Sequence, residues 1–264
     1  MKERIKIIVA IDLSFLFLLV VAGCISNVAV SEIFHYGAFI VPILLGFVYI
    51  YRNKTELEGS LDLLPKSDTL TLALIVLLPT VALTLCLSSV LGALKNALVG
   101  GVENVPGETF ATALILHAVL PAILEEMLFR YLPVQIIGKN RYAILLSAVT
   151  FSLAHTDLFA IPHTLAAGIL LGTITVICGS PLPAILIHFL NNAASLSITY
   201  FPKAASTVIS VIAAGALLSI VAIVIKRKAL LSYIREIKSD ISEHTPAPLI
   251  YIGASIFIAI TKLI

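Results

Sequence analysis

The sequence predicts an all-α, polytopic transmembrane helix bundle, and its composition, its hydropathy and the length of its apolar segments lead to this prediction. Of the 264 residues, 59% are hydrophobic and 12% are charged, and the mean hydropathy is +1.09. Soluble globular proteins average roughly 45–50% apolar and 25% charged residues. Apolar runs of about 20 residues, enough to cross a bilayer, recur along the chain. Lipid excludes open sheets, so these runs are expected to be helices.

The apolar runs predict eight or nine spans in one integral membrane domain over residues 1–264. The expected spans cover residues 7–30, 34–51, 69–94, 108–138, 142–157, 159–178, 182–200, 204–225 and 249–263. The last span is short, which leaves the count at eight or nine. A lipoprotein signal ending at Cys24 is the alternative for the first span. Asp12 interrupts its apolar core and the apolar stretch continues past Cys24, so an uncleaved span is favoured.

The distribution of basic residues predicts the orientation. With a cytoplasmic N-terminus, the cytoplasmic segments hold Lys2, Arg4, Lys6, Arg52, Lys54, Lys66, Lys139, Arg141, Lys226, Arg227, Lys228, Arg235 and Lys238, whereas the other side holds Lys95, Lys203 and Lys262. Cytoplasmic loops of membrane proteins carry such an excess of Lys and Arg. The net charge is only +2, so no nucleic-acid partner is expected, and membrane lipid is the expected environment.

Polar residues inside three of the spans are the candidates for function. An ionisable side chain near the bilayer centre costs at least ~2.5–3.5 kcal/mol, so it is expected to face a protein interior or cavity. These residues are Glu125, Glu126 and Arg130 in the fourth span, His155 at the end of the fifth, and His188 and Asn192 in the seventh. Glu126 and Arg130 are four residues apart on one helix face and are expected to form an ion pair. Glu125 points about 100° away and remains free for chemistry.

Helix depth predicts that these groups meet. Glu125 lies fourteen residues before Lys139, and His155 lies fourteen residues after Arg141. At 1.5 Å per residue, both lie roughly 20 Å from the predicted cytoplasmic helix ends. Two adjacent antiparallel helices therefore bring a carboxylate and an imidazole to one level. His188 and Asn192 share a face of the seventh span and enter from the same side.

Peptide hydrolysis is the chemistry that suits these groups. Glu125, assisted by His155, would deprotonate a water molecule, and the hydroxide would attack a scissile carbonyl. His188 and the Asn192 amide would donate hydrogen bonds to the oxyanion, where one donor is worth ~3–4 kcal/mol. No Ser or Cys nucleophile is required.

Three motifs resemble those of the CAAX protease and bacteriocin-processing family, which includes the Ras-converting CAAX endopeptidases. They are Glu125-Glu126-x-x-x-Arg130, Phe151-x-x-x-His155 and His188-x-x-x-Asn192, in that order and on separate spans. The segment 168–192 is similar to the region that joins the second and third motifs. The resemblance covers about residues 105–200, the expected catalytic core, and only the multi-span character is shared outside it.

The resemblance implies an intramembrane endopeptidase whose cavity opens to the cytosolic side, with peptide bonds hydrolysed near that face. Glu125 and His155 would activate water, and His188 and Asn192 would form the oxyanion hole. The implied substrate is a peptide or a prenylated protein, and the Ras-converting branch of the family implies a prenylated CAAX-type C-terminus. No cofactor is expected.

Two other functions remain open at this point. A zinc metalloprotease would use Glu125, His155 and His188 as ligands, although the chain has no His-Glu-x-x-His sequence. A non-catalytic protein, either a bacteriocin-immunity protein or a proton-coupled transporter, would also place acidic residues and histidines inside spans. A transporter more often has two repeated halves, which this sequence does not show.

Overall fold

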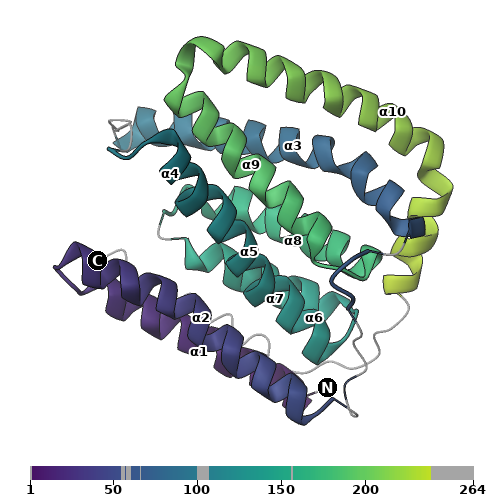
Figure 1. The fold of residues 1–264 in the computed structure, drawn as a ribbon. Helices are drawn as coiled ribbons and strands as arrows, with labels where there is room; N and C mark the ends of the chain where they lie inside the picture. Colours follow the sequence, from purple (N-terminus) through teal and green to yellow (C-terminus); the bar gives the residue numbers. More distant parts are fainter. Residues whose placement is uncertain are drawn as a thin grey trace.

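The computed structural model describes residues 2–54, 57, 61–65, 67–99, 107–155 and 157–238. Within these ranges every regular element is a helix, which confirms the all-α prediction (Figure 1). The ninth predicted span, 249–263, lies outside the described residues.

Eight predicted spans correspond to helical segments of the structure. The first three segments are α1 (Lys2–Gly23), α2 (Val28–Arg52) and α3 (Ser67–Val99). The fourth is a continuous row of five short helices: α4 (Phe110–Leu114), η1 (Ile115–Val119), α5 (Leu120–Glu126), η2 (Met127–Tyr131) and α6 (Leu132–Ile137). The last four are α7 (Arg141–Ala154), α8 (Ile161–Cys178), α9 (Leu182–Tyr200) and α10 (Ala205–Lys238), with the short 3-10 helix η3 (Pro202–Ala204) before α10. Seven of these segments are long and apolar enough to cross a membrane, and α7 is a shorter apolar helix. The chain is therefore a multi-pass membrane protein.

The helices pack in pairs around the row α4–α6. Helix α1 packs against α2, α7 against α8, and α3 against α10. Figure 1 shows the α1–α2 pair on one side of the bundle and the α3–α10 pair on the opposite side. The row α4–α6 lies between them with α7, α8 and α9, so the predicted site residues lie in the interior.

Hydrogen bonds between connecting segments define the two ends of the bundle. At the end where α1 begins, called the N-terminal end below, the Leu61 N–H donates to the Gln135 side chain (2.8 Å) and the Asp62 N–H to the Gly179 carbonyl (2.9 Å). These bonds join the α2–α3 connection to α6 and to the α8–α9 turn.

At the opposite end, called the far end below, Lys95 Nζ donates to Asp157 Oδ2 (2.6 Å) and the Tyr200 hydroxyl to the Glu108 carbonyl (3.1 Å). These contacts join the end of α3 to the α7–α8 loop, and the end of α9 to the start of α4. The helices thus alternate in direction, as the span prediction required.

Two wide π-helical turns interrupt the row α4–α6 on either side of the glutamates. The Leu120 N–H donates to the carbonyl of Ile115, and the Leu132 N–H donates to that of Met127, five residues back in each case. Pro121 and Pro133 follow these turns directly. A proline has no N–H and its ring crowds the preceding turn, so a locally wider helix relieves both problems. The turns set the direction in which the α5 side chains point.

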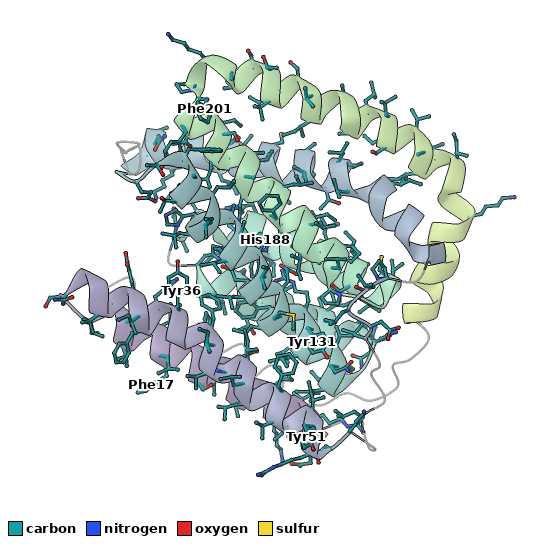
Figure 2. All side chains as sticks on the ribbon, in the orientation of Figure 1. Phe17, Tyr36, Tyr51, Tyr131, His188 and Phe201 are labelled. Atoms are coloured by element: carbon teal, nitrogen blue, oxygen red, sulfur yellow. The ribbon has the colours of Figure 1, made fainter. Side chains whose placement is uncertain are left out.

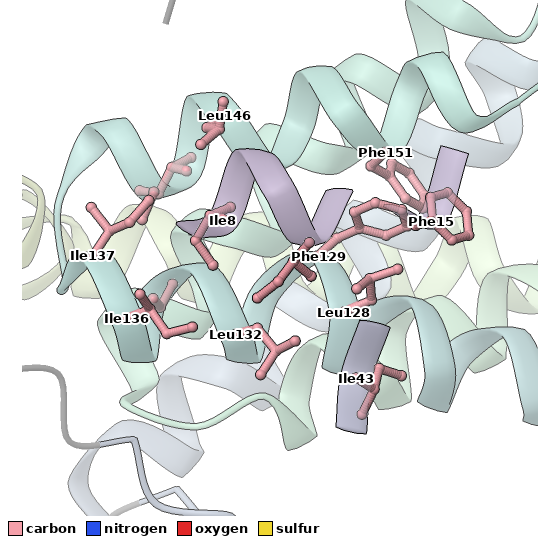
Figure 3. Packing of buried hydrophobic residues seen from close by; sticks show 14 of the residues in the cluster. Ile8, Phe15, Ile43, Leu128, Phe129, Leu132, Ile136, Ile137, Leu146 and Phe151 are labelled. Carbon is pink, nitrogen blue, oxygen red and sulfur yellow. The ribbon is translucent and has the colours of Figure 1, made fainter. Parts of the chain in front are cut away.

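Aromatic side chains hold α1 against the helices of the predicted site. The Phe129 ring lies 5.3 Å from the Phe15 ring and 5.7 Å from the Phe151 ring, centroid to centroid. Figure 3 shows these three rings next to one another, with Ile8 packed near Ile137 towards the other end of the cluster. One apolar cluster therefore joins α1, η2 and α7.

Helices α7 and α8 approach closely at a glycine. A Cβ atom added to Gly168 would lie 2.8 Å from the Ala148 Cα atom, which is too close for two carbon atoms. Small residues at such crossings allow membrane helices to pack backbone to backbone. At Gly37 in α2, an added Cβ would meet no atom within 4 Å.

We therefore expect Gly168→Ala to lower the free energy of unfolding by about 1–3 kcal/mol, because the added methyl group forces α7 and α8 apart. Thermal unfolding in detergent measures the effect. Gly37→Ala is the matched control and should leave stability unchanged or slightly raised, since Ala is the better helix former. Equal melting temperatures for the two variants would contradict the close packing of α7 and α8.

Candidate active site

The predicted ion pair is present at the centre of the bundle and includes a third group. Glu126 Oε1 lies 3.1 Å from Arg130 Nη1 and 2.9 Å from His188 Nδ1. The side chains of Glu126 and Arg130 are fully buried, and that of His188 is 9% exposed. Figure 2 shows His188 in the interior, between Tyr51 and Phe201 near opposite ends of the bundle. The Glu126–His188 contact was not predicted from sequence.

Arg130 is held by its carboxylate partner and by an aromatic ring rather than by well-directed hydrogen bonds. Its guanidinium nitrogens make no hydrogen bond within the described part of the chain. The guanidinium carbon lies 4.1 Å from the centre of the Phe151 ring, a cation–π contact. The Arg130 charge therefore stabilises the Glu126 carboxylate and also orients Phe151 of α7.

His188 lies between the two neighbouring glutamates. Its Nδ1 atom faces Glu126, and its Nε2 atom lies 3.8 Å from Glu125 Oε2. Because a carboxylate only accepts hydrogen bonds, the natural arrangement is an Nδ1–H that donates to Glu126. The Nε2 atom is then directed towards Glu125, whose side chain is 16% exposed.

His155 follows the last turn of α7 and has a fixed ring orientation. Its Nδ1 atom lies 2.9 Å from the Phe151 carbonyl, so Nδ1–H donates and Nε2 keeps its lone pair. The Phe151 ring lies 5.0 Å from the His155 ring and 5.8 Å from the His188 ring. Phe151 therefore positions both histidines.

A large cavity of about 600 Å³ contains Glu125 and His155. It is lined by residues of α1, α2, the α4–α6 row and α7, namely Phe15, Leu19, Val20, Ala22, Gly23, Cys24, Ser31, His35, Phe39, Glu125, Phe129, Ala154 and His155. The predicted convergence of a carboxylate and an imidazole is present here. The contribution of α1 and α2 was not predicted, because the resemblance covered only about residues 105–200.

A smaller cavity of about 90 Å³ lies behind His155. It is lined by Thr80, Thr84, Phe151, His155, His163, Thr164, Ala167, Leu171, Ile187, His188, Asn191 and Asn192. A cavity of about 10–15 Å³ already holds one water molecule, so this polar chamber has room for water. His155 borders both cavities.

The two adjacent asparagines have different environments. Asn191 accepts a hydrogen bond of 2.7 Å from the Thr84 hydroxyl of α3, which ties α9 to α3. Asn192 lines the chamber, and none of the described hydrogen bonds engages its side chain. Of the two, Asn192 has the amide that is available to a bound group.

An ion pair fixes the loop that follows His155. Asp157 accepts hydrogen bonds from Lys95 Nζ (2.6 Å) and from the Phe159 N–H (3.0 Å). The hydrogen bond from Lys95 lowers the pKa of the Asp157 carboxyl group, so the pair stays ionised at neutral pH. The tether holds the end of α7 against α3.

Among the residues that the structure describes, no three His, Cys, Asp or Glu side chains are arranged as a set that could hold a metal ion. This statement includes Glu125, His155 and His188, the set considered for zinc. Glu125 and His155 line the large cavity, and His155 and His188 line the small one.

We expect Arg130→Met to lower the free energy of unfolding by about 3–5 kcal/mol, because it leaves the Glu126 charge buried without its cationic partner. Thermal unfolding in detergent tests this expectation, with the exposed Arg52→Met as control. The double variant Glu126→Gln/Arg130→Met should be more stable than Arg130→Met alone, since it removes the uncompensated charge. A loss no larger than that of Arg52→Met would contradict the ion pair.

Comparison with known proteins places these residues in one family segment. The family model described as type II CAAX prenyl endopeptidase Rce1-like matches residues 107–194, which include every candidate site residue. No curated protein and no solved structure matches the chain. Over residues 107–194 the chain is therefore similar to the Rce1-like type II CAAX prenyl endopeptidases, which agrees with the family that the three motifs predicted.

Proposed function

We propose that this protein is an intramembrane endopeptidase in which Glu125 and His155 activate a water molecule while His188 and Asn192 stabilise the oxyanion. The observation that carries the proposal is the shared cavity: Glu125 and His155 line one space, and His188 lies within 3.8 Å of Glu125. The family match over this segment agrees with a protease.

The first step in this proposal is attack by water. The Glu125 carboxylate accepts a proton from a water molecule, while the lone pair on His155 Nε2 accepts a hydrogen bond from the same molecule. The water oxygen forms a bond to the scissile carbonyl carbon, and the carbonyl oxygen becomes negative. Glu125 then passes its proton to the departing nitrogen as the C–N bond breaks. The polar chamber on the other side of His155 is a source of further water.

The oxyanion would be stabilised by α9. With both ring nitrogens protonated, His188 donates from Nδ1 to Glu126 and from Nε2 to the developing oxyanion. The Asn192 amide is one helical turn further along α9 and supplies a second donor. In this arrangement Glu126 and Arg130 do not touch the substrate, and they fix the position and charge of His188.

The cavity walls indicate which substrates fit. Apart from Glu125, His155 and a few polar rim residues, the lining of the 600 Å³ cavity is apolar. Such a space suits a peptide with a flanking lipid or apolar segment, in line with the prenyl endopeptidase family. A farnesylated CAAX peptide is therefore the first substrate to test.

We expect Glu125→Gln and His155→Gln each to lower kcat for this peptide by about 10²–10⁴-fold, because each removes a group that activates water. His117→Gln is the control, since His117 bonds to Glu108 (2.7 Å) and lines neither cavity. A quenched fluorescent peptide and purified protein give the rates, with and without chelator.

Inactivation by chelator that zinc reverses would replace the glutamate mechanism with a metalloprotease. No cleavage by folded wild type would favour a non-catalytic function.

The adjacent asparagines give a second test. Asn192→Ala should lower kcat by about 10²–10³-fold with little change in KM, as expected for a donor that acts in the transition state. Asn191→Ala removes the bond to Thr84 and should affect thermal stability more than kcat. The reverse pattern, with Asn191 controlling kcat, would overturn the assignment of Asn192 to the oxyanion.

A further inference from the structure

The proposed reaction leaves one carboxyl group of the membrane interior unexplained. Asp12 lies in the middle of α1, one of the helices long and apolar enough to cross a membrane, and is 1% exposed. An ionisable side chain at such a position is costly, so it is expected to make specific contacts within the protein and to serve a function. Helix α1 lies outside residues 107–194, so the matched family segment does not include this group.

Asp12 makes a hydrogen bond to α7. Its Oδ2 atom accepts from the hydroxyl of the buried Thr150 at 3.1 Å. The same hydroxyl lies 2.9 Å from the Leu146 carbonyl of its own helix. Asp12 comes ten residues after the start of α1 and Thr150 nine residues after the start of α7, so both lie roughly 13–15 Å from the N-terminal end. Thr150 therefore joins α7 to α1 at one level of the bundle.

This hydrogen bond lies one helical turn from the large cavity on both helices. Phe15 follows Asp12 by three residues and lines the cavity, and Ala154 follows Thr150 by four residues and lines it as well. His155 is the next residue after Ala154. The bond thus holds two walls of the cavity together directly beside the proposed reaction site.

The position of His155 depends on where α7 lies. The His155 ring is held by the Phe151 carbonyl, and its backbone N–H donates to the Ser152 carbonyl (3.3 Å). The ring therefore moves with the last turn of α7. Glu125 belongs to α5, so the separation of the two proposed catalytic groups is set by the contacts of α7 with its neighbours.

Polar contacts hold α7 from two directions. The Ser147 hydroxyl donates to the Phe129 carbonyl of η2, and the Thr150 hydroxyl, one turn later, donates to Asp12 of α1. Aromatic rings also lie between α1 and α7 (Figure 3). Ring pairs pack over a range of offsets, whereas a hydrogen bond requires a defined distance and angle. The bond to Asp12 is therefore a contact that can fix the rotation of α7 against α1.

We infer that Asp12 is a positioning residue for the proposed reaction: through Thr150 it fixes α7 so that His155 meets the same water molecule as Glu125. The inference rests on the proposed endopeptidase function and adds α1 to the parts of the chain that serve it. Asp12 lines neither of the two cavities, so it acts through α7 rather than on the substrate. The contact needs an oxygen acceptor at the Oδ2 position, which an amide also supplies.

Substitutions at the two partners test the contact with the quenched farnesylated peptide. Asp12→Leu removes the acceptor and should lower kcat about 10–100-fold with little change in KM, because a misplacement of about 1 Å at a reacting group can cost 10²-fold. Thr150→Val should have the same effect. Asp12→Asn keeps the acceptor and should retain most of kcat. Wild-type kcat in Asp12→Leu, or an equal loss in Asp12→Asn, would overturn the inference.

A matched control separates positioning from stability. Ile8 is fully buried one turn before Asp12 in α1 and packs near Ile137, away from the cavities (Figure 3). Ile8→Ala should lower the melting temperature in detergent and leave kcat of the folded protein unchanged. If Ile8→Ala lowers kcat as much as Asp12→Leu, Asp12 has only a structural role and the inference is wrong.

Double variants test whether Asp12 acts through His155. In the His155→Gln background, Asp12→Leu should cause no further loss of kcat, because the group that Asp12 positions is already absent. In the Asn192→Ala background, Asp12→Leu should lower kcat by its full factor, since Asn192 belongs to α9. A full additional loss in the His155→Gln background would contradict a route through His155.

The imidazole signals distinguish a failure of this inference from a failure of the proposed function. NMR spectra of protein with isotope-labelled histidine are recorded in detergent for wild type, Asp12→Leu and Ile8→Ala, and His155→Gln identifies the His155 signal. We expect Asp12→Leu to shift this signal and Ile8→Ala to leave it in place. A shift without any cleavage by folded wild type overturns the peptidase and leaves the positioning of His155. Cleavage by wild type, with neither a shift nor a loss of kcat in Asp12→Leu, overturns the positioning and leaves the peptidase.

Discussion

The buried contact of Glu126 with Arg130 and His188 is the interaction on which the rest of the site depends. Moving an ion out of water costs several kcal/mol, so these groups persist in the interior only because they compensate one another. The three residues come from the α4–α6 row and α9, and Arg130 also covers Phe151 of α7. One ionic cluster thereby fixes the rotation of three segments. Such a cluster contributes more to a unique arrangement than to stability, since an apolar core of the same volume would cost less.

The same cluster gives the two adjacent glutamates different roles. Glu126 is fully buried and contacts a cation and an imidazole, so its negative charge is already compensated. Glu125 points from the same helix into the large cavity, and within the described part of the chain its charged neighbour is His188, whose Nε2 atom lies 3.8 Å away. A carboxylate held at a cavity wall beside an imidazole is suited to exchange a proton with water. Exchanging the two positions would place the free carboxylate in the packed core.

Sequence patterns predicted the features of this site that are local, and missed those that depend on packing. The eight helical segments that match predicted spans follow from apolar length, and the Glu126–Arg130 pair follows from a spacing of four residues. The contact of His188 with Glu126 depends on how far α9 is rotated, which no local pattern encodes. Pro121 and Pro133 are visible in the sequence, but the widened turns before them depend on how the surrounding helix adjusts. Helices α1 and α2 lie outside the segment that carries the three motifs, so the motifs did not indicate that they line the cavity.

The chemistry of the site and the orientation of the bundle in the membrane have separate physical causes. The catalytic arrangement depends on contacts between helix interiors, and these contacts are identical whichever way the bundle is inserted. Orientation depends on basic residues in the connections, which touch none of the site residues. A change of a few loop charges can therefore present the same glutamate, histidines and asparagine to the opposite compartment. The family match over residues 107–194 thus bears on the reaction, whereas Arg4, Arg52, Lys139 and their basic neighbours bear on the orientation of the bundle.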